Sequence, residues 1–352
     1  MIIAALLLFC AFLLVLVKSS DYFVSAAARV AKYLGVSEFV IGLTIVSLGT
    51  TLPELGTSIF AAFGGTPDLA IGNALGSVVA NIGLILGISA VAVKITVERE
   101  KLARDCMVLL GVVVLFALFA YDGGISFLEG CACLAIVPVH IALKLGGTYK
   151  GSEILYWPKR YLLKEYLNVY HGLGKVVSLG TYRSGFYHIS SKSSYERFFA
   201  AGLPRDVALM LGLAILIGVS ARYMVGYAVE IASFLGIGEG IIGATLIAIG
   251  TSLPELSVAI SSIRRGFNNI MLGNIIGANI LNMTLITGAA AAITPLEAAT
   301  AEMSVLLPFT FMMSSLLFIF VRTRIGIGRA AGAVFIAMYA VFTYLMAAGS
   351  LA

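Results

Sequence analysis

Charged residues, cysteine, histidine and tryptophan are all scarce in this sequence. Only 12% of its 352 residues are Asp, Glu, Lys or Arg, and 60% are hydrophobic, whereas about 25% of a soluble domain is charged. This composition excludes an ordinary soluble domain and predicts a protein that crosses the membrane many times. The four cysteines fall in apolar segments without metal-site spacing, so neither a disulfide framework nor a cysteine-bound metal is expected.

The apolar segments also lack the residue sets that intramembrane enzymes use. They hold no Ser/His/Asp set, no paired aspartates and no His-Glu-x-x-His motif. The three histidines, His140, His171 and His188, lie in or near the one long polar stretch. We therefore expect neither an enzyme nor a bound cofactor.

Long apolar segments, in contrast, are abundant. Ten of them reach the roughly 20 residues that a helix needs to cross a bilayer, at about 2–34, 39–63, 69–93, 103–121, 125–145, 205–236, 241–263, 269–293, 303–321 and 328–349. They predict an all-α polytopic membrane protein with ten transmembrane helices, located in the cell membrane.

The net charge of +5 is explained by membrane topology and needs no nucleic acid partner. If the N-terminus lies outside, ten crossings place nearly all of the 23 Lys and Arg residues in inside loops, as the positive-inside rule requires. Both termini are therefore predicted outside, and the polar stretch 146–204 is predicted in the cytoplasm. This stretch contains either an interfacial helix or a plain basic linker.

The chain contains an internal repeat at a constant offset of 201 residues, from about Ser19 to Ile88. Its clearest part is the heptapeptide Gly-Thr-Thr-Leu-Pro-Glu-Leu at 49–55, which returns at 250–256 as Gly-Thr-Ser-Leu-Pro-Glu-Leu. Five predicted crossings separate the copies, and an odd number inverts their orientation. The predicted domains are a first five-helix repeat, a cytoplasmic linker and an inverted second repeat, at 1–145, 146–204 and 205–352.

Each heptapeptide places a carboxylate and a proline inside an apolar segment. Glu54 and Glu255 are costly there, and intramembrane acids usually have a function. Pro53 and Pro254 should break predicted helices 2 and 7, because proline lacks the N–H of the helical ladder. Main-chain carbonyls freed in a membrane are tolerated where they line a cavity or bind an ion. Each copy thus offers hard oxygen ligands for a cation, and inverted repeats with broken helices indicate an alternating-access transporter.

A second repeated motif, Gly-Asn-x-x-Gly-[Ser/Ala], follows at 72–77 and 273–278. In the first copy, Asn73, Ser77 and Asn81 are four residues apart and share one helix face. The glycines would let this helix approach the broken helix closely, which would bring amide and hydroxyl oxygens to the glutamates. Charged residues on the first and sixth segments are expected to pair or to face water near a helix end: Lys18, Asp21, Arg222 and Glu230.

The two motifs together resemble the α-repeats of the calcium/cation antiporter superfamily, which includes Na⁺/Ca²⁺ and H⁺/Ca²⁺ exchangers. The resemblance covers both halves of the chain. It implies a ten-helix fold in which segments 2, 3, 7 and 8 enclose the ions while segments 1 and 6 slide across them. It further implies inorganic cations and the lipid bilayer as partners, with no protein partner evident.

The resemblance also implies roles for individual residues. Glu54 and Glu255 would bind Ca²⁺ together with the main-chain carbonyls of Thr50 and Thr251. The hydroxyls of sodium-type sites would come from Thr51, Ser252 and Ser77, while Asn81 and Asn282 would complete the ring beside the glutamates. Asn73 and Asn274 would brace the broken helices.

Two positions depart from sodium-coupled members of the family. Ala278 stands where a serine is expected, and Asn282 stands where an acidic residue is often found. One hydroxyl and one negative charge are therefore missing. Two carboxylates balance Ca²⁺, and proton uptake would neutralise them once Ca²⁺ leaves, so H⁺ is favoured as counter-ion and Na⁺ is the alternative. A cation channel is the alternative of another class.

Overall fold

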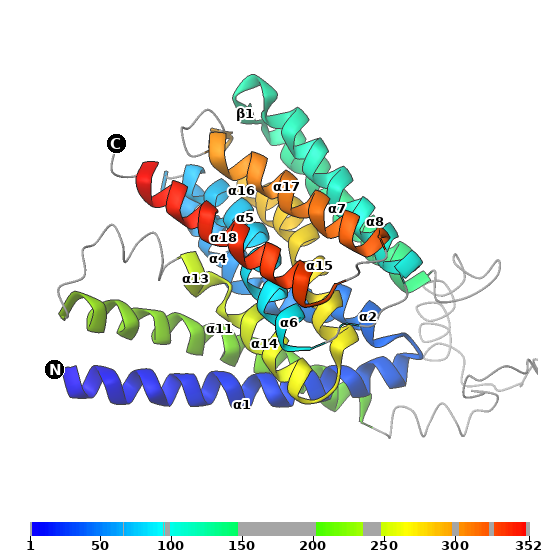
Figure 1. Cartoon of the computed structure of the whole chain (residues 1–352), viewed down its shortest axis with the longest axis vertical. Helices are drawn as coiled ribbons and strands as arrows, with labels where there is room; N and C mark the ends of the chain where they lie inside the picture. The colour runs from blue at the N-terminus through cyan, green and yellow to red at the C-terminus, as the bar shows by residue number, and fades with distance from the viewer. Residues whose placement is uncertain are drawn as a thin grey trace, which may run out of the picture.

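The computed structural model describes residues 2–65, 67–93, 95, 99–146, 202–234, 248–297, 303–323 and 327–349, and the structural statements below concern these residues. They form a bundle of helices (Figure 1). The start of the predicted seventh span, 241–247, and nearly all of the predicted linker lie outside the described residues.

The first half contains five groups of helices in chain order. They are α1 (Ile2–Leu34); α2 (Glu38–Ile41) with η1 (Gly42–Val46), α3 (Ser47–Thr50) and α4 (Leu52–Phe63); α5 (Pro67–Ala80) with η2 (Asn81–Leu86) and α6 (Gly87–Ala92); α7 (Arg99–Phe119); and α8 (Phe127–Gly146). The short η3 (Ala120–Asp122) and β1 (Gly124–Ile125) lie between α7 and α8.

The second half repeats this order. Its elements are α11 (Leu203–Phe234); α13 (Ala248–Thr251) with α14 (Leu253–Arg264); α15 (Asn268–Leu281) with η5 (Asn282–Ile286) and α16 (Thr287–Ala291); α17 (Met303–Arg322); and α18 (Arg329–Gly349). The two-residue strand β2 (Leu296–Glu297) pairs antiparallel with β1. Apart from this one ladder in the described chain, the predicted all-α class is confirmed.

Both motif helices are broken at the predicted places. Thr51 (φ −84°, ψ 1°) separates α3 from α4, and Ser252 (φ −89°, ψ 8°) separates α13 from α14. The first break bends the span by 44°. Pro53 and Pro254 sit in the first turn of α4 and α14, where the missing N–H costs least.

Within the described residues, eight helices are long and apolar enough to cross a membrane, or nine if the bent pair α2–α3 and α4 is one span. The remaining predicted span contains α13 and α14, whose preceding residues are not described.

The centre of the bundle is α15, whose residues from Ile270 to Leu281 are all buried. It packs against α2, η1 and α3 of the other repeat. A Cβ added at Gly273 would lie 2.2 Å from the main-chain oxygen of Phe39, and one at Gly277 would lie 2.4 Å from that of Leu43. The two repeats therefore meet backbone to backbone, and only glycine permits this approach.

The long helices α1 and α11 lie side by side along one edge of the bundle (Figure 1). On the other side, α7 packs against α17, α18 against α6, and α8 against α16. This arrangement leaves the broken helices and α5 and α15 enclosed between the two outer groups.

Candidate functional site

Two carboxylic acids meet in the middle of the enclosed helices. Glu54 lies in the first turn of α4 and Glu255 in the first turn of α14, and both side chains are almost fully buried, with 1% and 0% exposed. The two carboxyl groups are close enough to interact with each other. Each also benefits from the positive end of its own helix. The two repeats thus contribute one acid each to a single site.

Several oxygens of the predicted ligand residues are buried without a hydrogen bond to any described residue. They are Glu54 Oε2, both carboxylate oxygens of Glu255, the hydroxyl oxygens of Ser77 and Ser252, and the amide oxygens of Asn81 and Asn282. A buried oxygen left unpaired costs roughly 1–3 kcal/mol, and more if charged. A hard cation that takes six to eight oxygen ligands satisfies such a set, so the donor chemistry fits Ca²⁺ as cargo.

The threonines of the first break are held by the helix that precedes them. The Thr51 hydroxyl donates to the main-chain oxygen of Ser47 at 2.8 Å, which leaves its lone pairs available to a cation. The Thr50 hydroxyl donates to the Asn274 amide oxygen at 3.1 Å, and so joins the first break to α15 of the other repeat. Because Pro53 has no N–H, the Gly49 carbonyl loses its helical donor.

The two residues expected to brace the broken helices differ in what they contact. Asn73 Nδ2 donates to the main-chain oxygen of Glu54 at 3.1 Å and to the Ser58 hydroxyl at 2.9 Å, which ties α5 to α4 within one repeat. Asn274 instead accepts from Thr50 across the repeats, and its amide nitrogen bonds to no described residue. Asn73 and Asn274 thus occupy matching positions in the two repeats but make different contacts.

One residue of the site was missing from the sequence-based set. Asn279 is fully buried, and its amide oxygen accepts from Asn81 Nδ2 at 2.9 Å across the two repeats. At the 201-residue offset its counterpart is Val78, so comparison of the repeats did not reveal it. The sequence did offer one signal for Asn279: it is a third asparagine within the apolar segment 273–282, next to Ala278.

Polar contacts also join α1 to the site-forming helices and to α11. The Arg265 guanidinium lies 3.6 Å from the Asp21 carboxylate and donates to the Ser25 hydroxyl at 2.7 Å. Arg29, also on α1, forms an ion pair with Asp206 of α11 through two hydrogen bonds of 2.9 and 2.7 Å. Asp21 therefore pairs, which is one of the two outcomes expected for it, but its partner Arg265 was not among the residues considered for pairing from the sequence.

Comparisons with known proteins agree with this architecture. The family model described as sodium/calcium exchanger protein matches residues 4–145 and 206–348. Sodium/calcium exchanger MaX1 of Methanosarcina acetivorans is 36% identical over 337 residues, covering 95% of this chain and 96% of that protein. Inner membrane protein YrbG of Escherichia coli is 37% identical over 305 residues, covering 84% and 82%.

The fold is also that of a solved exchanger. A structure of the sodium-calcium exchanger NCX_Mj, soaked with Na⁺ and without Ca²⁺, superimposes with a TM-score of 0.74 at 31% identity, covering 97% of this chain and 98% of that one. The resemblance drawn from the paired motifs is therefore confirmed, and the family is one of membrane transporters. The chain belongs to the sodium/calcium exchanger family.

Proposed function

We propose that the protein carries Ca²⁺ across the cell membrane in exchange for a monovalent cation, by alternating access. The observation that carries the proposal is the buried carboxyl pair, Glu54 and Glu255, contributed by matching broken helices of two repeats. Two carboxylates balance the charge of one Ca²⁺, so neutral oxygens suffice for the remaining ligands.

The proposed Ca²⁺ ligands include that pair. They are the carboxylates of Glu54 and Glu255, the main-chain carbonyls of Thr50 and Thr251, and the amide oxygens of Asn81 and Asn282. Thr51, Ser77 and Ser252 would add hydroxyl oxygens for the smaller counter-ion when Ca²⁺ is absent. Asn73 and Asn274 are proposed to hold the broken helices in place.

Two counter-ions are supported by different observations. H⁺ is supported by Ala278 and Asn282, which leave the second repeat short of a hydroxyl and of a charge. Protonation of the facing carboxyls would neutralise the empty site without any additional ligand. Na⁺ is supported by the sodium/calcium exchangers MaX1 and NCX_Mj, which this chain resembles over almost its full length.

Uptake of ⁴⁵Ca²⁺ into proteoliposomes separates these cases. The liposomes hold the purified full-length protein, and an outward Na⁺ gradient or an outward H⁺ gradient is imposed in turn. Uptake driven by one gradient alone identifies the counter-ion. Uptake that requires neither gradient and does not saturate would indicate a channel and contradict the proposal.

The orientation in the membrane is part of the proposal. The basic loops support external termini and a cytoplasmic segment at 146–204. An alkaline phosphatase fused to the C-terminus should be active in a bacterial host, because this enzyme works only outside the cytoplasm. An inactive but membrane-inserted fusion would reverse the assignment.

A further inference from the structure

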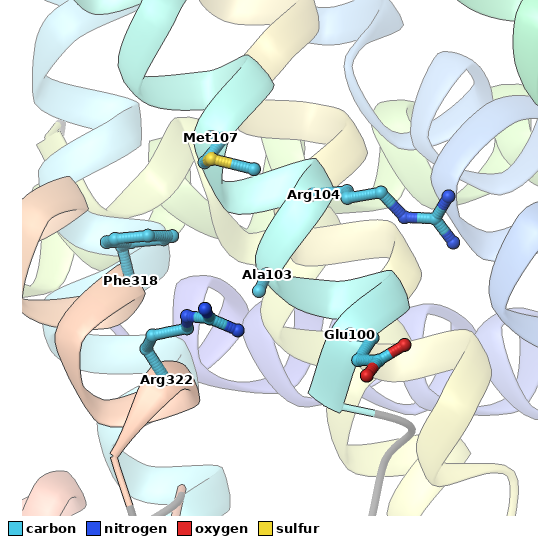
Figure 2. A pocket seen from close by; sticks show the side chains of 6 residues that line it. All are labelled: Glu100, Ala103, Arg104, Met107, Phe318 and Arg322. Atoms are coloured by element: carbon cyan, nitrogen blue, oxygen red, sulfur yellow. The ribbon is translucent and has the colours of Figure 1, made fainter.

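The seam between α7 and α17 contains two hollows that the exchange site does not use. The first has a volume of about 440 Å³ and lies at the start of α7 and the end of α17 (Figure 2). It is lined by Glu100, Ala103, Arg104, Met107, Phe318 and Arg322. We refer to it as the basic hollow.

The second hollow lies farther along the same seam and is apolar. Its volume is about 330 Å³, and it is lined by residues from Val113 to Leu118 of α7 and from Leu307 to Phe311 of α17. We refer to it as the apolar hollow. The two are about ten residues apart along α7, or roughly 15 Å at the helical rise. That spacing lies within the length of one phospholipid acyl chain.

Two arginines give the basic hollow its charge. Arg104 and Arg322 are exposed, and neither forms an ion pair or a hydrogen bond with any residue that the structure describes. The neighbouring Asp105 is buried and paired with Lys144 of α8, and its carboxylate also interacts electrostatically with Arg104. Figure 2 shows Arg322 extending from α17 towards α7 below Phe318, while Arg104 extends from α7 on the side away from Phe318.

The charge of the basic hollow and the apolar surface beside it indicate what kind of ligand the seam binds. Two guanidinium groups and the Glu100 carboxylate leave a net charge of about +1 in the basic hollow, which suits one phosphate. The side chains of Met107, Leu118 and Phe311 are 52%, 66% and 48% exposed along the same seam, as expected of a surface that faces hydrocarbon. A free phosphate would use only the basic hollow and leave the apolar one unexplained.

We propose that the α7–α17 seam binds one anionic phospholipid. Its phosphate lies in the basic hollow, whose lining includes Arg104 and Arg322, and one acyl chain fills the apolar hollow. By the proposed topology this lipid belongs to the cytoplasmic leaflet, where basic pockets between transmembrane helices bind anionic headgroups. The Glu100 carboxylate repels a second negative charge on the headgroup, so the hollow favours lipids whose headgroup carries one negative charge.

Native mass spectrometry of the full-length protein in detergent tests the proposal. Dioleoyl phosphatidylglycerol, phosphatidylethanolamine and phosphatidylcholine are added in turn at equal concentration, and retained lipid is counted. We expect one tightly retained phosphatidylglycerol. Arg104→Gln and Arg322→Gln should each weaken its binding about fivefold, and the double variant should lose the headgroup preference. Arg329→Gln, an exposed arginine at the same end of the bundle but outside the hollow, should change nothing.

Two further variants test the proposal independently of the arginines. Glu100→Gln removes the one negative charge and should strengthen phosphatidylglycerol binding. Ala117→Phe fills the apolar hollow and should weaken retention of all three lipids without changing their order. The proposal is overturned if the double arginine variant retains phosphatidylglycerol like the wild type, if phosphatidylethanolamine binds equally well, or if inorganic phosphate displaces the lipid completely.

Discussion

At the scale of single residues, the carboxyl pair is the feature that most directly links structure to ion binding. Two buried acids in contact repel each other when both are charged, and a bound Ca²⁺ removes that repulsion. If the pair binds Ca²⁺ as proposed, occupancy of the site stabilises the folded protein. This coupling can be measured without transport.

We predict that Glu54→Gln and Glu255→Gln each abolish the thermal stabilisation that Ca²⁺ gives. A ligand at 100 times its dissociation constant adds about 2.7 kcal/mol to the stability of the wild type. In a chelator, both variants should melt at a higher temperature than the wild type, since the repulsion is gone. The measurement is a melting curve with and without Ca²⁺. A normal Ca²⁺ shift in either variant would contradict the ligand assignment, and Glu230→Gln, an exposed acid on α11, is the matched control.

Asn279 shows what sequence comparison within the chain can miss. With Asn81 Nδ2 donating to Asn279, the Asn81 amide oxygen has no hydrogen-bond partner among the described residues, as the proposed ligand role requires. Asn279 acts in this arrangement as a positioning residue. The symmetry of the repeats made Val78 and Asn279 equivalent, whereas in the structure the Asn279 side chain hydrogen-bonds to the other repeat, which a valine side chain cannot do.

We predict that Asn279→Val, which installs the residue of the first repeat, raises the Ca²⁺ concentration needed for half-maximal flux about tenfold. The Asn81 amide would lose its partner, and an unsatisfied buried donor costs roughly 1–3 kcal/mol. Flux measured against Ca²⁺ concentration gives the value, with the exposed Asn269→Val as control. An unchanged half-maximal concentration would mean that Asn81 needs no positioning partner.

At the scale of helices, the breaks were predictable and the local winding was not. Because proline lacks the N–H of the helical ladder, both helix breaks were expected from the proline of each heptapeptide. The winding changes to π-helical turns at Asn81 and Asn282. No residue pattern marked them, although such turns often occur at functional sites. The pairing of β1 with β2 was likewise invisible, because each strand has only two residues.

The closest contact between the repeats depends on glycines of α15. We predict that Gly273→Ala and Gly277→Ala destabilise the protein by about 1–3 kcal/mol or more, because the new methyl group meets main-chain atoms that cannot move aside. The matched control is Gly111→Ala on α7, where a Cβ meets no described atom within 4 Å. Melting temperatures in detergent test this. If the α15 variants are as stable as the Gly111 variant, the backbone contact is looser than the structure shows.

At the scale of the whole molecule, the two repeats are alike in sequence but unlike in their contacts. Arg265 at the end of α14 pairs with Asp21 of α1, and the residues at the 201-residue offset are Gly64 and Arg222, which cannot pair. The ion pair therefore has no counterpart in the inverted arrangement. In the proposed alternating-access cycle, this ion pair would favour the arrangement seen here.

We predict that Asp21→Asn shifts the population away from the arrangement seen here, by about fivefold for an interaction of roughly 1 kcal/mol. Spin labels replacing the exposed residues Lys32 and Arg264, in a background without the four cysteines, report the separation of α1 and α14. The longer-distance population should grow in the variant. An unchanged distance distribution would show that the ion pair does not bias the equilibrium.

The central claim is that one Ca²⁺ crosses the membrane between Glu54 and Glu255. Its most direct test is tracer exchange, in which proteoliposomes loaded with unlabelled Ca²⁺ take up external ⁴⁵Ca²⁺, whatever the counter-ion. The wild type and Glu230→Gln should accumulate the tracer, while Glu54→Gln and Glu255→Gln should not exceed protein-free liposomes. Substantial exchange in both single glutamine variants would contradict the account.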